Sequence, residues 1–170
     1  RWLTMETLLK HWPANMWIQT PLELTDRLLT EHDIKKDDIA EIIVDPPTYL
    51  RMYYSPDGYS SMMQAQFSIP YMLACLILDH TPGANWCDET KLKDSEILAL
   101  AAEIHGGNSD MLYMPQCFKN FQKGRHPVIT VTIKTCSGKE YSETMEGHLG
   151  HPRMMMTPEQ FKDRFRIQAA

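Results

Sequence analysis

The sequence predicts an α+β fold in which a small, largely antiparallel β-sheet is covered by helices, including one buried apolar helix. Residues 127–134 are rich in valine and isoleucine. A Ser-Gly pair at 137–138 joins them to a second β-rich run over 139–145, which is the pattern of a β-hairpin. Residues 67–78 are mostly apolar on every side, which is typical of a helix at the centre of a domain. Helices packed over one small sheet are the architecture that we expect from these segments.

The first helix is predicted over residues 20–31, where leucines recur near helical spacing. Thr20 is the expected N-cap, Pro21 takes the first helical position, and Glu23 follows three residues after the cap. Together these residues form a capping box, a signature of a helix N-terminus.

The central helix is predicted over residues 61–79. Pro70 falls inside it or in its first turn, which leaves the register before Tyr71 open because proline removes a helical hydrogen bond. A further helix is expected to begin after Asp94, a good N-cap. The His-Gly-Gly-Asn run at 105–108 is expected to terminate it.

The last helix opens with a second capping box at residues 157–160, and Phe161, Phe165 and Ile167 are expected to face inward. The other segments carry the marks of strands, turns or loops. They are a strand at 39–44, a possible second strand at 48–54, a turn at 55–58, an irregular segment at 109–124 and a loop at 147–153.

Composition excludes several classes of protein. The chain has 170 residues, the length of one ordinary domain, so we expect a single domain over residues 1–170. Its net charge of -5 argues against nucleic-acid binding, which needs a basic face. No apolar stretch approaches the length needed to cross a bilayer, so no membrane role is expected. Nucleotide-binding glycine motifs, GxSxG and HExxH are absent, which disfavours nucleotide-dependent and serine-hydrolase chemistry.

The four cysteines do not have CxxC spacing, which removes the common zinc and thioredoxin patterns. We interpret them as free thiols in a reducing compartment and expect a cytoplasmic protein. No secretory signal is evident. The sequence begins at Arg1 instead of Met, which suggests a fragment of a longer protein.

Four short strings occur in a suggestive order along the chain. They are Lys10-His11-Trp12-Pro13-Ala14-Asn15, Gln66-Phe67-Ser68-Ile69-Pro70-Tyr71, Gly147-His148-Leu149-Gly150-His151-Pro152-Arg153, and Met156-Thr157-Pro158-Glu159-Gln160-Phe161. In this order they resemble the C-terminal half of the MmgE/PrpD family, which includes 2-methylcitrate dehydratase, cis-aconitate decarboxylase and iminodisuccinate epimerase. The resemblance covers nearly the whole chain, from Lys10 to about Phe165.

The resemblance implies the smaller, lid-like C-terminal domain of a two-domain protein. In that family a larger all-helical domain lies N-terminal, supplies most catalytic groups and forms most of a homodimer. That domain would be the main partner of this chain. The resemblance also implies a small di- or tricarboxylate substrate and no metal or nucleotide cofactor.

Lys10 and Asn15 are the first two residues that the resemblance assigns to substrate binding. Lys10, Trp12, Pro13 and Ala14 match the family pattern of a lysine, an aromatic residue, proline and a small residue. In the family this lysine reaches a substrate carboxylate, a role that suits a cationic donor. Asn15 stands where several members carry histidine. An amide can orient a carboxylate but cannot act as a base near neutral pH, so proton transfer is not expected here.

Arg51 and Tyr53 are the other two predicted substrate-binding residues. They lie in the tyrosine-rich run 48–54, whose simplest interpretation is strand packing with a surface arginine. The resemblance suggests that a tyrosine in this region faces the substrate, and Tyr53 is our choice. Arg51 could bind a carboxylate through two hydrogen bonds. No catalytic residue is assigned.

His148 and His151 have HxxH spacing in a glycine-rich loop. No third ligand of clear spacing accompanies them, so no metal site is predicted, and we interpret the loop as a conformational feature. Cap or surface roles are expected for four other histidines at the ends of elements. These are His32, His80, His105 and His126.

The first functional hypothesis is a domain of an enzyme that closes over a polycarboxylate during proton transfer next to a carboxylate, giving dehydration, decarboxylation or epimerisation. The chain alone is expected to be inactive. The alternative is a non-catalytic interaction domain or relic that binds a partner chain, which Asn15 favours. A small enzyme of the chorismate mutase kind is disfavoured because the chain has few arginines to bind such a substrate.

Overall fold

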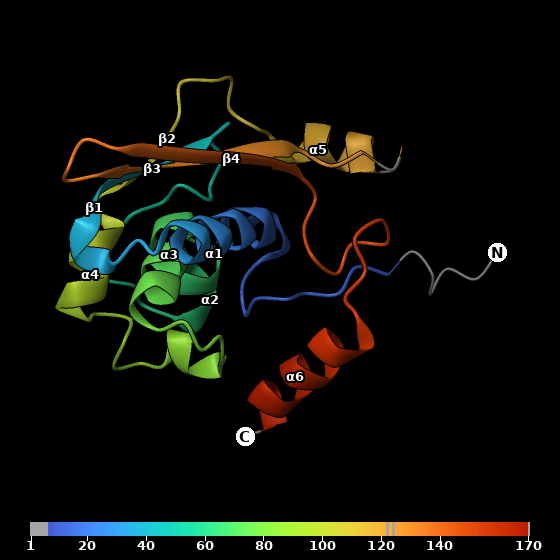
Figure 1. Cartoon of the computed structure of the whole chain (residues 1–170), viewed down its shortest axis with the longest axis horizontal. Helices are drawn as coiled ribbons and strands as arrows, with labels where there is room; N and C mark the ends of the chain where they lie inside the picture. The colour runs from blue at the N-terminus through green and yellow to red at the C-terminus, as the bar shows by residue number, and fades with distance from the viewer. Residues whose placement is uncertain (1–6, 122, 124, 170) are drawn as a thin grey trace.

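The computed structural model describes residues 7–121, 123 and 125–169, and it shows one sheet covered by helices (Figure 1). The sheet has four strands in the order β2-β1-β3-β4. Their bounds are β1 Ile39–Asp45, β2 Ile104–Gly106, β3 Val128–Thr135 and β4 Glu140–Glu146. Strand β3 pairs antiparallel with β1 and β4, while β1 pairs parallel with β2. The α+β class and the predicted hairpin are confirmed, but the sheet is mixed.

Helices α1, α3 and α4 lie on one side of the sheet, and Figure 1 shows the sheet edge-on with these helices beneath it. The α-helices are α1 Gln19–His32, α2 Met62–Gln66, α3 Ile69–Leu78, α4 Ser95–Ala101, α5 Met114–Phe121 and α6 Pro158–Ala169. Short 3-10 helices occur at η2 Met16–Ile18, η3 Lys36–Asp38 and η4 Ala84–Cys87. None of the described helices combines the length and apolar character that crossing a membrane requires.

The predicted buried apolar helix is confirmed in α3, because every residue from Ile69 to Ile77 is buried. The prediction of one continuous helix over 61–79 is wrong, since Phe67 and Ser68 separate α2 from α3. The Ser68 hydroxyl caps α3 by accepting a hydrogen bond from the Tyr71 amide at 3.2 Å. Pro70 then lies in the first turn of α3, where a missing N–H is tolerated.

Helix α1 begins one residue earlier than predicted, and the capping box at Thr20 is absent. The residue before the helix is Ile18, whose side chain makes no capping hydrogen bond. Thr20 is buried inside the first turn and its hydroxyl donates to the Gly147 carbonyl at 2.6 Å. Tertiary contacts therefore use the polar side chains that the sequence pattern assigned to a local cap.

The second strand predicted over 48–54 does not form. Thr48 makes only an isolated bridge with Leu112, and Leu50 has a φ of 59°, which ends any extended run. The segment predicted as irregular, 109–124, contains α5. Asp94 caps α4 as predicted, but His105 and Gly106, which were expected to belong to the loop that terminates this helix, lie in β2.

Helix α6 forms with the predicted capping box, in which the Thr157 amide donates to Gln160 at 2.9 Å and the Gln160 amide donates to the Thr157 hydroxyl at 3.2 Å. The inward orientation of its apolar residues is wrong, since Phe161 and Phe165 are 52% and 66% exposed. Figure 1 shows α6 well apart from the sheet, so the core does not reach these side chains.

Candidate functional site

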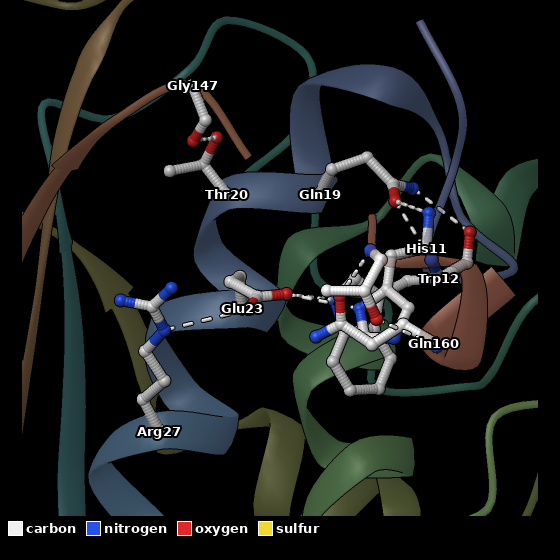
Figure 2. A network of polar contacts seen from close by, with 9 residues as sticks. His11, Trp12, Gln19, Thr20, Glu23, Arg27, Gly147 and Gln160 are labelled. Carbon is white, nitrogen blue, oxygen red and sulfur yellow. Dashed lines mark hydrogen bonds and ion pairs between the residues drawn. The ribbon is translucent and has the colours of Figure 1, made fainter. Parts of the chain in front are cut away.

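Residues 10–15, here called the Lys10 segment, are attached to the first turn of α1 by a buried glutamine. The Gln19 side-chain oxygen accepts hydrogen bonds from the amides of His11 and Trp12 at 3.0 and 2.9 Å. Its side-chain amide donates to the carbonyls of Trp12 and Ala14 at 3.0 and 3.1 Å. Figure 2 shows Gln19 facing this backbone. A single fully buried side chain therefore fixes the backbone on the C-terminal side of Lys10.

Glu23 lies one turn further along α1 and holds the side chains of the same segment (Figure 2). Its carboxylate contacts the His11 ring nitrogen at 3.1 Å, the Trp12 indole N–H at 3.3 Å and Arg27 at 3.6 Å. Burial acts to raise the pKa of Glu23, but the interactions with His11, then Arg27 and Trp12, outweigh it and hold the pKa below its ordinary value. The carboxylate is thus ionised and stabilises the segment.

Lys10 itself is exposed and stands at the rim of an open hollow of about 260 Å³. The lining residues are Lys10, Pro13, Ala14, Met62, Gln66, Gly83, Ala84 and Cys87. Burial and the charge of Asp88 raise the pKa of the Cys87 thiol to about 11, so this thiol is protonated at neutral pH. The hollow therefore has the exposed Lys10 side chain at its rim, and Cys87 provides no base.

Asn15 has a structural role at the start of η2. Its side-chain oxygen accepts a hydrogen bond from the Trp17 amide at 3.2 Å and caps η2. Its own amide donates to the Gln66 carbonyl at 3.0 Å, which joins the segment to the end of α2. Asn15 thus connects the Lys10 segment to a wall of the hollow.

Arg51 packs its guanidinium over the Phe67 ring, 4.5 Å from the ring centre, and donates to the Leu50 carbonyl at 3.3 Å. Its buried Nε has no hydrogen-bond partner among the described residues, and burial lowers the pKa of the guanidinium. The Arg51 carbonyl accepts from the Ile69 amide at 2.7 Å. Arg51 is therefore a partly buried cation that packs against the break between α2 and α3. It does not lie in a strand over 48–54, which the sequence suggested.

Tyr53 is 52% exposed, and its backbone is held from the same break between α2 and α3. Its carbonyl accepts hydrogen bonds from the Ser68 hydroxyl at 2.6 Å and the Tyr59 hydroxyl at 3.2 Å. Its ring meets the Tyr59 ring edge-on, with the ring centres 5.9 Å apart. The phenol of Tyr53 is thus presented to solvent by a fixed backbone.

The break between α2 and α3 at Phe67 and Ser68, together with the flanking Gln66 and Ile69, relates the four predicted residues. Asn15 bonds to Gln66, Arg51 contacts Phe67 and Ile69, and Tyr53 accepts from Ser68. Lys10 shares its hollow with Gln66. No hydrogen bond between any two of the four occurs in the described part of the chain. The string Gln66 to Tyr71, one of the four strings of the family resemblance, is the scaffold of the candidate site.

Sequence reasoning missed a cluster of three histidines, His126, His148 and His151. The ring centres of His126 and His151 are 4.0 Å apart, and those of His148 and His151 are 6.5 Å apart. His126, for which a cap or surface role was expected, is half-buried and lies in this cluster. Burial, followed by His151, lowers the pKa of His126 to about 4, and burial with both neighbours lowers that of His148 to about 4. Among the described residues, no group of three metal-binding side chains is arranged to hold an ion.

The HxxH spacing pointed to two of these histidines, but no local pattern could place His126 beside them. It precedes β3, and the β3-β4 hairpin returns the chain to the same end of the sheet, where the 147–151 loop begins. The cluster is thus a consequence of strand pairing.

An α+β domain with an exposed lysine at an open hollow is the class that this fold and site define. A family model for the MmgE/PrpD C-terminal domain matches residues 12–170, and the chain belongs to this family. No curated protein matches the chain. The match supports a domain of a dehydratase-like enzyme.

Proposed function

We propose that this chain is the substrate-closing domain of an enzyme that acts on a small di- or tricarboxylate by proton transfer next to a carboxylate. The observation that carries the proposal is the position of Lys10, exposed at the rim of an open hollow and fixed from behind by Gln19 and Glu23. A lysine on a rigid backbone can reach a carboxylate that enters the hollow.

Arg51, which packs on Phe67 at the break between α2 and α3, supports the same substrate class. Its side chain is partly exposed, and stacking on Phe67 limits the orientations of the guanidinium. A planar cation held in this way suits a carboxylate better than a freely moving one, because less entropy is lost on binding. Tyr53 and Asn15 are the neutral hydrogen-bonding groups that we propose beside it.

The proton-transfer groups are proposed to come from an N-terminal all-helical domain of the same protein. Asn15 is an amide and the Cys87 thiol is held protonated, so neither serves as a base near neutral pH. Closure of this domain over the other would exclude water and strengthen the attraction between Lys10 and the substrate. We propose that the whole protein is a cytoplasmic homodimer and that its reaction is a dehydration, decarboxylation or epimerisation without metal or nucleotide.

The test compares this chain with the full-length protein that contains it, using citrate, cis-aconitate and related polycarboxylates as substrates. We expect turnover from the full-length protein and none from the 170-residue chain. Turnover by the chain alone would refute the need for a second domain. An inactive full-length protein that also binds no polycarboxylate would refute the proposed function.

A non-catalytic role is the second candidate, and the capping role of Asn15 favours it. The position where several family members carry histidine holds here an amide whose oxygen already accepts from Trp17. A full-length protein without turnover that retains a tight protein partner would support this candidate. Substituting Asn15→His in that inactive protein and recovering turnover would show a relic of the enzyme.

A further inference from the structure

The loop over residues 147–151 closes on the segment that carries Lys10. The Leu9 amide donates to the Gly150 carbonyl at 3.0 Å, one residue before Lys10. Gly150 has a φ of +95°, and a Cβ at this position would collide with the Leu9 carbonyl oxygen. The other end of the loop is attached to α1, since the Gly147 carbonyl accepts from Thr20 at 2.6 Å (Figure 2). The loop therefore fixes the Lys10 segment on its N-terminal side, opposite to Gln19.

The same loop carries a buried imidazole with one unpaired ring nitrogen. His148 is only 3% exposed, and its Nε2 has no hydrogen-bond partner among the described residues. It lines a cavity of about 20 Å³, room for one water molecule. The cavity is lined by Met16, Trp17, Thr20, Thr48, Phe121, His126, Pro127, Ile129 and His148. A charged imidazole would be poorly solvated in such mostly apolar surroundings.

We propose that the 147–151 loop is a latch that positions Lys10 at the hollow, and that the latch stays closed only while His126, His148 and His151 are neutral. The importance of Lys10 for substrate rests on the proposed function, whereas the latch itself does not. The geometry explains the dependence on charge. The three rings lie edge to face within one cluster, so a proton on any of them repels a proton on the next.

Charged groups from the neighbouring elements do not cancel this effect. Glu146 on β4 raises the pKa of His126 and His151, and Glu23 on α1 raises that of His148, as does the Leu9 backbone. Arg153, in the following segment, lowers the pKa of His126 and His151. Burial is the largest cause for all three histidines, and their pKa values end below the ordinary value.

The sign of the pH dependence follows from linkage. An imidazole released to water takes up a proton below about pH 6.5, whereas the closed latch excludes that proton until about pH 4. Acidification therefore favours the open latch. From about pH 7.5 to about pH 5.5 the equilibrium constant for opening rises about tenfold for each histidine with a pKa near 4, or about 100-fold for His126 and His148 together.

Hydrogen exchange of the Leu9 amide measures the opening directly, because this amide is bonded to the loop. The experiment uses the chain itself, at about pH 7.5 and about pH 5.5, with intrinsic exchange rates subtracted. We expect protection of Leu9 to fall about 100-fold on acidification, and the double variant His126→Phe with His148→Phe to lose most of this response. The control His105→Gln, at an exposed position of β2, should respond as the wild type does.

A wild-type Leu9 amide whose protection changes less than about threefold would overturn the latch, as would a folded double variant that responds like the wild type. If the double variant does not fold, NMR titration of the wild-type imidazoles decides. Measured pKa values of His126 and His148 below about 5 support the latch, and ordinary pKa values near about 6.5 overturn it. Neither readout needs a substrate. A working latch in a protein that binds no polycarboxylate would therefore refute the proposed function but not the latch.

Discussion

Gln19 hydrogen-bonds both backbone polar groups of Trp12, accepting from its amide at 2.9 Å and donating to its carbonyl at 3.0 Å. The pairing joins the first turn of α1 to a segment that has no regular secondary structure of its own. Buried backbone groups need partners, and this side chain supplies them where neither a helix nor a sheet does.

Replacing Gln19 by alanine should lower the free energy of unfolding by about 2–4 kcal/mol, because buried backbone groups of His11, Trp12 and Ala14 lose their partners. Urea unfolding followed by circular dichroism measures the change. The control is Gln116→Ala, at an exposed position of α5, which should leave stability within about 0.5 kcal/mol. Equal effects of the two substitutions would contradict the role of Gln19.

Replacing Glu23 by glutamine should destabilise the protein at neutral pH and much less in acid. The pKa of Glu23 is lowered in the folded state, so its contribution is present above the ordinary value of 4.5 and is lost as pH falls through the folded value. The measurement is the difference in unfolding free energy between wild type and variant at about pH 7 and about pH 3.5. The exposed Glu31→Gln serves as the control. A difference that grows in acid would oppose this assignment.

Removing the amine of Lys10 should weaken substrate binding without unfolding the domain. In the full-length protein we expect Lys10→Ala to raise KM for a polycarboxylate about 10- to 100-fold, the loss of one charge-assisted hydrogen bond. Steady-state kinetics with a thermal-melting check measures both effects. The control is Lys139→Ala, an exposed lysine at the β3-β4 turn. An unchanged KM would remove Lys10 from the site.

A methyl group at Gly150 should displace the Lys10 segment. Gly150→Ala combines a positive φ with a collision against the Leu9 carbonyl, so we expect at least about tenfold loss of Leu9 amide protection at neutral pH. Gly138→Ala is a matched control, because its φ is +80° but its Cβ would meet nothing within 4 Å. Backbone strain alone is common to both variants. Loss of Leu9 protection in both would show that the contact with Leu9 is not the cause.

The sequence determined the elements whose signals are local. The apolar run from Ile69 to Ile77 forms the buried helix, and the Thr157 capping box opens α6. The valines and isoleucines of 128–133 form the strand of a hairpin whose turn is Ser137-Gly138. Side-chain period, caps and turn residues act within a few positions, so a sequence shows them directly. The family resemblance, and with it the Lys10 segment, came from the same local strings.

Only the tertiary structure decided which distant residues meet. The three residues Ile104–Gly106 carry too little pattern to predict a strand, and they become one because β1 offers a free edge. Thr20 and Glu23 match a local capping pattern. In the folded chain the Thr20 hydroxyl instead donates to the Gly147 carbonyl, and the Glu23 carboxylate contacts the His11 ring. The apolar side chains of α6 remain exposed because the core lies elsewhere. Periodicity shows that a residue is apolar or polar, whereas its partner depends on how the whole chain packs.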